Sequence, residues 1–251
     1  MSVSEFDHLP APFRPAGEHV AIDLVGGRAL FTTRRGGSST GPYASLNMGS
    51  TATPPPADVL ENRRTVVDRL GVTLAWGHQV HGIHVAVREG AAAPAGTPGQ
   101  ADGQATASRG VAATVMVADC LPVALAGEGA VAMIHAGWRG LAAGIIGEGV
   151  EQLRELEVRG PLSAAIGPGA GPCCYEVGEE VHAAFSDHGS SVRHGRNLDL
   201  KAIAARELER AGVEIVHDVD LCTICADRSL FFSHRRDHGV TGRQAGLVWR
   251  R

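Results

Sequence analysis

The sequence predicts an α+β fold in which a mixed or antiparallel system of sheets carries helices on its outside. Two observations lead to this prediction. Short β-leaning runs follow one another through tight turns, and helical stretches are mixed with strands without a regular strand–helix–strand alternation. The 33 glycines and 13 prolines among 251 residues also indicate many tight turns, and therefore short strands and loops that can carry function.

The first elements are a hairpin and a helix. The runs VAIDLV and RALFTT are joined by Gly26 and Gly27, so we expect a β-hairpin over residues 20–33. Asp58 is expected to start a helix with an apolar face, and Gly71 is a suitable stop. Residues 90–104, which read GAAAPAGTPGQADGQ, are predicted to form a flexible surface loop.

The middle of the chain contains consecutive strand candidates. The short turns between them favour antiparallel pairing, and the turn GEG connects the fourth candidate to the run AVAMIHAG. Residues 138–156 have helical spacing despite their glycines and are predicted to form one helix after that run. The four strand candidates are TLAWGHQ, IHVAVR, TVMVAD and LPVALAG.

The last elements alternate between strands and helices. SAAIG is expected to be a strand, EVGEEVHAAF a helix, and LDLKAIAARELERAG an amphipathic helix with Asp199 near its N-cap. VEIVHD and QAGLVW are expected to close the chain as strands. No internal repeat is detected, and a length of 251 residues fits either one large domain or two small ones. Residues 1–18 are expected to form an irregular N-terminal segment.

The composition argues against two classes of partner. The net charge is −4 and no basic stripe is present, so we expect no nucleic-acid partner. No stretch approaches the roughly 20 apolar residues of a membrane span, and no signal-peptide pattern is seen, so a soluble, cytoplasmic protein without a membrane partner is expected.

The five cysteines form a poor disulfide framework, which favours free thiols in a reducing compartment.

The stretch HQVHGIH places three histidines at every third position from residue 78 to residue 84. Glycines at 77 and 82 argue against a helix. Along an extended strand, His78 and His84 face one way and His81 faces the other, so the three are not expected to act together. Taken alone, each is better explained as an ordinary half-exposed histidine than as a metal ligand.

Two strand ends supply partners for a site. VMVADCLPV breaks at Asp119 and Cys120, and AVAMIHAGWRG delivers His135 just before a predicted helix. Arg139 in the first turn of that helix would place a guanidinium and backbone N–H groups near His135, which suits an anion, although it could equally form a surface ion pair. His81, Cys120 and His135 together would form a His₂Cys set suited to Zn²⁺ or copper, with a fourth position open. The separations of 38 and 14 residues give this set almost no support by themselves.

The remaining four cysteines have structural as well as functional interpretations. Cys222 and Cys225 form a CxxC, but neither a thioredoxin-like unit nor a second pair for a zinc ribbon is evident, so we interpret this motif as structural. Cys173 and Cys174 lie in a glycine- and proline-rich stretch that suits either a substrate loop or a plain turn.

Two further polar segments are candidates for a substrate site. FFSHRRDHG is basic and aromatic, so it would either bind an anionic or hydrogen-bonding substrate or form a solvated loop. TTRRGGSSTGPYASLNMG, which contains Arg34 and Asn47, would be either a lid or a simple loop.

Together these stretches resemble the YfiH-like laccase-domain family, whose members are described as polyphenol oxidases and as zinc-dependent purine nucleoside phosphorylases. The matching motifs run in the family's order from about residue 31 to residue 246, and HAGWRG with ADCLP and QVHG upstream is a highly specific combination. The resemblance implies a single α/β/β/α-type domain over residues 1–251, with mixed sheets and flanking helices. The motifs are TTRRGG, PYASLNMG, ENRR, QVHG, ADCLPV, HAGWRG, IGPGAGPCCYEVGEEV, FFSHRRD and TGRQAG.

The resemblance also assigns residues. It implies that the metal ligands are His81, Cys120 and His135, and that Zn²⁺, or alternatively Cu²⁺, is the cofactor. It implies that Arg34 and Asn47 line the substrate site, and that its neighbours are Arg139, Cys174 and Arg235.

The activity implied by the resemblance is phosphorolysis of adenosine, inosine, guanosine or methylthioadenosine to base and sugar 1-phosphate, with adenosine deamination as a companion. The substrates would be a purine nucleoside and phosphate, and Asp119 is a candidate for protonating the purine. One alternative is a copper-dependent polyphenol oxidase, although the chain contains no HxH motif. Others are a cysteine hydrolase or amidase that uses Cys120, and a non-catalytic binding module.

Overall fold

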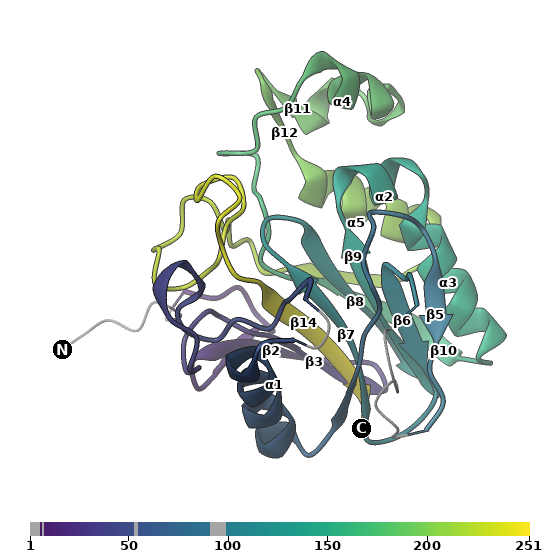
Figure 1. Cartoon of the computed structure of the whole chain (residues 1–251). Coiled ribbons are helices and arrows are strands. Elements are labelled where there is room, and N and C mark those ends of the chain that lie inside the picture. The colour runs from purple at the N-terminus through teal and green to yellow at the C-terminus, as the bar shows by residue number, and fades with distance from the viewer. Residues whose placement is uncertain (1–5, 7, 53–54, 91–98) are drawn as a thin grey trace.

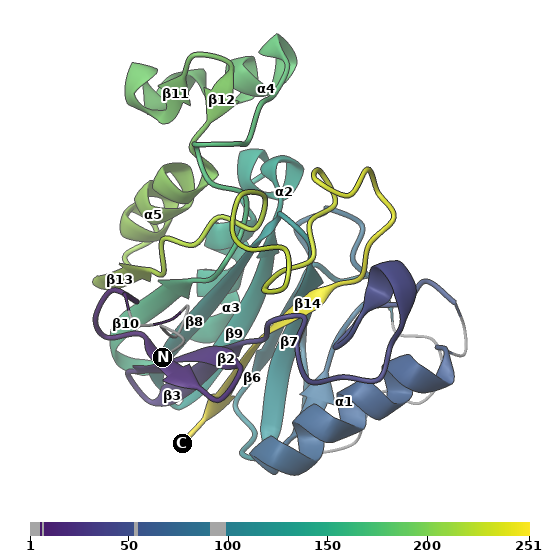
Figure 2. The same ribbon diagram turned by 90° about the vertical axis from the view of Figure 1, so that its left-hand side faces the viewer.

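The computed structural model describes residues 6, 8–52, 55–90 and 99–251. Two six-stranded sheets pack face to face, and helices cover the outer face of each (Figures 1 and 2). The expected mixed sheets with flanking helices are therefore confirmed, in the layer order helix, sheet, sheet, helix. No helix in the described ranges has both the length and the apolar character needed to traverse a bilayer.

The first sheet contains the predicted N-terminal hairpin and the last strand of the chain. All its neighbours are antiparallel except β4 and β7, and α1 (Ala57–Leu70) packs on its outer face, ending at Gly71 in the left-handed conformation. In spatial order its strands are β1 (Arg14–Ala16), β2 (His19–Leu24), β3 (Gly27–Phe31), β14 (Gln244–Arg250), β7 (Val111–Val117) and β4 (Thr73–Ala75). The prediction of an irregular segment over residues 1–18 is wrong at β1, which pairs with β2; residues 1–5 and 7 lie outside the described part.

The second sheet carries most of the candidate site. Its neighbours are antiparallel except for the pairs β10–β13 and β5–β6. Its outer face packs against α3 (Ile145–Glu155) and α5 (Leu200–Arg210), whose N-cap Asp199 accepts a hydrogen bond from the Ala202 N–H. The strands in spatial order are β13 (Ile215–Asp218), β10 (Arg159–Ile166), β8 (Leu121–Glu128), β9 (Ala130–Ala136), β6 (Gly103–Thr106) and β5 (Val85–Val87).

The smaller elements surround one end of the second sheet. α2 (Trp138–Ala142) follows β9 directly, and α4 (Glu179–Ala184) projects with the hairpin of β11 (Arg193–His194) and β12 (Asn197–Leu198) at the top of Figure 1. Three single 3₁₀ turns, η1 to η3, complete the described secondary structure: Gly41–Tyr43, Ser186–His188 and Ser190–Val192.

Three sequence-based expectations need correction. The antiparallel series of middle strands is wrong, because β7 belongs to the first sheet and β8 to the second, and β4 and β5 each have a parallel partner. The single helix over residues 138–156 is two helices, since Gly144 takes a left-handed conformation with φ of 94°. The loop predicted over residues 90–104 ends early, because β6 begins at Gly103; residues 91–98 lie outside the described part.

The apolar core between the two sheets consists mainly of small and branched side chains. Ala113 of β7, Ala124 of β8 and Val131 of β9 are fully buried there beside Phe31 of β3. Small side chains let the two sheets approach closely, so the backbone positions at the sheet ends are fixed by packing on both faces. This rigid frame holds the polar residues described next.

Candidate metal centre

The centre lies where the chain passes from the first sheet to the second. Asp119 and Cys120 connect β7 to β8, and Asp119 has a positive φ of 88°, which turns the chain sharply between the sheets. His135 lies near the end of β9, opposite Pro122 of β8, so the hairpin of these two strands brings it beside Cys120. His81 comes from the loop between β4 and β5.

The side chains of His81, Cys120 and His135 converge. Their ligand atoms all lie within 4.8 Å of one another, and His81 Nε2 is 3.7 Å from Cys120 Sγ. Zinc bonds of about 2.3 Å to sulfur and about 2.05 Å to nitrogen in a tetrahedral site place those two atoms roughly 3.5 Å apart. The donor set and its spacing therefore fit a zinc ion.

Asp102 positions two of the three converging residues, His81 and His135. Its carboxylate is 2.8 Å from His135 Nδ1 and accepts hydrogen bonds from the backbone N–H groups of Val80, His81 and Gly82. The left-handed conformation of His81, with φ of 61°, turns these three N–H groups towards one carboxylate. Because Nδ1 of His135 is engaged, Nε2 is the nitrogen left to face a metal.

The charges of the centre depend on one another. Burial opposes the charged form of both residues, but the charge of His135 and the hydrogen bonds from both histidines lower the pKa of Cys120 to about 6. The charge of Cys120 and the hydrogen bond to Asp102 in turn raise the pKa of His135 to about 9. Between these two pKa values and without metal, Cys120 is therefore favoured as a thiolate and His135 as an imidazolium. A bound cation would take the place of the proton on His135.

Burial also opposes the charged form of Asp102, yet the hydrogen bond with His135 and the backbone donors lower its pKa. Sequence reasoning missed this residue because ADGQ completes a stretch rich in alanine, glycine and proline that reads as a loop. A carboxylate just before a short buried strand was the available signal, and it is weak.

Gly137 is the backbone position that gives the ligands room. A Cβ atom on this residue would lie 2.9 Å from His81 Cδ2 and 3.1 Å from Cys120 Sγ. Its φ of −77° is open to any amino acid, so the glycine is needed here for space rather than for conformation.

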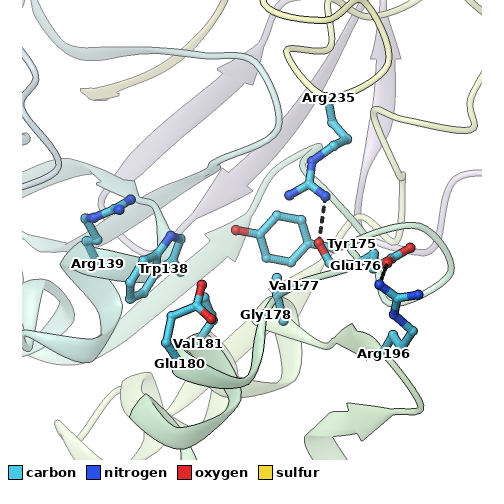
Figure 3. A pocket seen from close by; sticks show the side chains of 10 residues that line it. All are labelled: Trp138, Arg139, Tyr175, Glu176, Val177, Gly178, Glu180, Val181, Arg196 and Arg235. Atoms are coloured by element: carbon cyan, nitrogen blue, oxygen red, sulfur yellow. Dashed lines mark hydrogen bonds and ion pairs between the residues drawn. The ribbon is translucent and has the colours of Figure 1, made fainter.

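A pocket of about 380 Å³ opens among α2, the loop after β10, α4 and the C-terminal loop (Figure 3). Trp138 and Arg139, which open α2 shortly after β9, line one side of the pocket. The Arg139 guanidinium lies 4.3 Å from the Trp138 ring centroid. Opposite them, the Arg235 guanidinium lies 5.4 Å from the centroid of the Tyr175 ring and donates to the Glu176 carbonyl. The lining also includes Glu176, Val177, Gly178, Glu180, Val181 and Arg196.

The Tyr175 hydroxyl points towards Trp138 and Arg139 in Figure 3. Burial, followed by the charge of Cys120, raises the pKa of Tyr175 to about 12. The hydroxyl is therefore a neutral hydrogen-bond donor at physiological pH. The pocket adjoins the His/Cys centre, because Trp138 of its wall directly follows Gly137, where an added Cβ atom would lie 2.9 Å from His81 Cδ2.

The other predicted site residues have varied positions. Arg139 and Arg235 line the pocket, as described. Asp119 accepts hydrogen bonds from the Thr223 hydroxyl through Oδ1 and from the Arg235 N–H through Oδ2, so its carboxylate positions the C-terminal loop. Cys174 Sγ lies within a separate group of cysteine sulfurs rather than among the pocket lining.

Arg34 and Asn47 lie in the long segment after β3. The Arg34 guanidinium donates to the Ala44 and Arg228 carbonyls, and Asn47 Oδ1 accepts from the Arg243 N–H. Both side chains therefore fasten this segment to the C-terminal loop. Their role in substrate binding stays a prediction.

The family model described as multi-copper polyphenol oxidoreductase laccase matches residues 28–251. The chain belongs to this family. A purine nucleoside phosphorylase of Pseudomonas aeruginosa is 40% identical over 234 residues, which cover 88% of this chain and 93% of that relative. A relative of the same name from Escherichia coli, YfiH, is 36% identical and covers 88% of this chain and 93% of its own length.

Solved structures share the fold. The crystal structure of YlmD from Geobacillus stearothermophilus superposes with a TM-score of 0.85 at 34% identity, over 96% of this chain and 100% of that one. The YfiH protein of Bacillus licheniformis gives the same TM-score and coverage at 30% identity. The resemblance stated from the sequence motifs is thus confirmed.

Proposed function

We propose that this laccase-family chain is a zinc-dependent purine nucleoside phosphorylase that acts on adenosine, inosine, guanosine or methylthioadenosine. The observation that carries the proposal is the His/Cys centre directly beside a pocket that combines arginine guanidinium groups with aromatic rings. Phosphate and a purine need these two kinds of partner. The names of the curated relatives support the same activity.

His81, Cys120 and His135 would hold the metal, and Asp102 would keep the His135 ring in place. Three protein ligands leave one coordination position open, which is typical of catalytic rather than structural zinc. When bound, zinc would supply Lewis acidity towards an oxygen of phosphate or water.

The pocket residues account for substrate binding. The Arg139 and Arg235 guanidinium groups bind and orient phosphate, while the rings of Trp138 and Tyr175 contact the purine. A phosphate oxygen forms the new bond to C1′ of the sugar as the bond from C1′ to the purine nitrogen breaks. The purine leaves with the bonding electron pair and takes up a proton.

Tyr175 is better placed than Asp119 to assist the leaving purine. The Tyr175 hydroxyl is protonated and faces the pocket, whereas both oxygens of Asp119 already accept hydrogen bonds from the protein. Adenosine deamination is the companion activity of the proposal. In that reaction water adds to C6 of the purine, ammonia leaves, and inosine is formed.

Purified, zinc-loaded protein should release hypoxanthine and ribose 1-phosphate from inosine and phosphate, and ammonia from adenosine. His81→Ala and Cys120→Ala should abolish both activities, whereas His84→Ala, an exposed histidine of the same loop, should keep them. Equal activity in Cys120→Ala and wild-type protein would contradict the proposal. Activity that survives complete metal removal but is lost on alkylation of Cys120 would favour the cysteine hydrolase alternative.

A copper-dependent phenol oxidase is the second candidate, favoured by the description of the family. A His₂Cys set also suits copper. Protein purified without added metal should be analysed for zinc and copper, and its oxidation of a phenol measured before and after copper loading. Copper in the purified protein, together with phenol oxidation faster than phosphorolysis, would favour this candidate.

A further inference from the structure

Four cysteines outside the His/Cys centre form a second cluster. Cys173 and Cys174 lie in the loop after β10, and Cys222 and Cys225 lie in the loop after β13. Because β10 and β13 are parallel neighbours, the loops that follow them begin at the same end of the second sheet. The four sulfur atoms all lie within 4.8 Å of one another.

Backbone hydrogen bonds hold the two loops together independently of the sulfurs. The Gly169 N–H donates to the Leu221 carbonyl at 3.2 Å, and the Thr223 N–H donates back to the Gly169 carbonyl at 3.0 Å. This short parallel bridge places the CxxC turn against the Cys173–Cys174 pair. The sulfur cluster is therefore part of an ordered junction between two loops.

Backbone N–H groups also surround one of the sulfurs. The Gly171 N–H donates to Cys222 Sγ at 3.2 Å, and the backbone N–H groups of Ile224 and Cys225 are hydrogen-bonded to the same atom. Hydrogen bonds of this kind stabilise a thiolate. A side chain at Gly171 would crowd Cys222, since a Cβ atom there would lie 3.2 Å from Cys222 Cβ.

The spacing of the sulfurs is that of a metal site rather than of a disulfide. Cys173 Sγ and Cys225 Sγ are 3.5 Å apart, whereas a disulfide requires about 2.05 Å. A tetrahedral zinc ion with four bonds of about 2.3 Å to sulfur holds the sulfurs roughly 3.8 Å apart. We infer that Cys173, Cys174, Cys222 and Cys225 bind a structural zinc ion as four thiolates.

The chemistry of this second site differs from that of the His/Cys centre. Four thiols each release a proton when the ion binds, no electron is transferred, and four protein ligands leave no coordination position for substrate. Its effect is on the pocket wall, because Cys174 directly precedes Tyr175. The zinc ion fixes the loop that presents the Tyr175 ring, and this role does not depend on which reaction the pocket catalyses.

The metal content of the whole protein tests the inference. Protein purified under reducing conditions should contain two zinc ions per chain by elemental analysis. Cys222→Ser and Cys120→Ser should each retain one, and the double variant none. X-ray absorption at the zinc edge of Cys120→Ser should show sulfur neighbours alone at about 2.3 Å, whereas Cys222→Ser should show nitrogen and sulfur.

A second variant tests whether the loss of zinc could result from unfolding of the protein. Cys173 is exposed, so Cys173→Ser should retain the circular dichroism spectrum of the wild type while losing one zinc ion. A single zinc ion in the wild type that disappears in Cys120→Ser would overturn the inference. Loss of two hydrogen masses from the wild type, restored by reductant, would overturn it in favour of a disulfide. None of these measurements depends on nucleoside turnover.

Discussion

Asp102 connects the two histidines of the His/Cys centre through a single buried carboxylate. Oδ1 faces both His135 Nδ1 and the His81 N–H, and Oδ2 accepts from the Val80 and Gly82 N–H groups. One side chain therefore sets the ring orientation of one ligand and the backbone conformation of another.

Replacing Asp102 by asparagine should weaken zinc binding at the His/Cys centre. The neutral amide would lose the charge that favours the His135 N–H and would turn an amide nitrogen towards backbone donors or the ring. We expect zinc affinity to fall about 10- to 100-fold, as measured by competition with a chelator. Asp187→Asn, at an exposed position, is the matched control; unchanged affinity in Asp102→Asn would refute the role of the carboxylate.

At the residue scale, the sequence motifs identified all three converging side chains, because strand ends and family motifs mark them. Asp102 was missed, since its importance comes from contacts with residues about 20 and 33 positions away that no local pattern reveals. The CxxC partner pair was missed for a similar reason. Cys173 and Cys174 are adjacent rather than spaced, and only the parallel pairing of β10 and β13 brings them to Cys222.

The start of α2 is an element whose position is fixed by the centre beneath it. Gly137 is the N-cap residue of this helix and passes directly over His81 and Cys120. The element is short, with Trp138 and Arg139 in its first turn, so any shift of its start moves the pocket wall as well as the metal ligands.

Gly137→Ala should therefore lower zinc affinity and activity together while the protein remains folded. The added methyl group would press on His81 Cδ2 and Cys120 Sγ, which are closer than ordinary contacts allow. Gly147→Ala in α3 is the control, because no atom lies within 4 Å of the added Cβ. That variant should bind zinc normally and gain roughly 0.5–1 kcal/mol in unfolding free energy. Equal zinc affinity in the two variants would contradict the expectation.

At the element scale, local signals predicted well and non-local ones did not. The N-terminal hairpin and α1 were expected because turn glycines, apolar periodicity and a C-terminal glycine are all local. The parallel pairs β4–β7 and β5–β6 depend on residues far apart in sequence, which strand patterns do not encode. The helix break at Gly144 could not be predicted, because a glycine in a helical pattern can either continue the helix or take the left-handed conformation that ends it.

The stability of the whole molecule should depend on pH through His19. This histidine is 5% exposed at the start of β2, and its Nδ1 accepts a hydrogen bond from the Thr33 N–H. Burial, followed by the charge of Arg69, lowers the pKa of His19 to about 4. The unfolded chain, with a pKa near 6.5, therefore takes up a proton first as the pH falls.

The contribution of neutral His19 is thus complete above about pH 6.5 and is lost as the pH falls towards 4, by at most about 3 kcal/mol. Denaturant unfolding of wild-type protein and His19→Gln across this range should give curves that converge at low pH. His194→Gln, whose side chain is 53% exposed, should follow the wild type. A constant difference between wild type and His19→Gln at every pH would argue against the titration.

The hairpin of β8 and β9 has a consequence for the order in which the chain folds. Cys120 and His135 both lie at the open end of this hairpin, so pairing across one short turn is enough to place them side by side. His81 is 39 positions from Cys120 in the sequence, and the Asp102 carboxylate that accepts its N–H directly precedes β6, which pairs with β9. Two of the three proposed ligands thus belong to one local hairpin, and the complete centre would form only once both sheets have assembled.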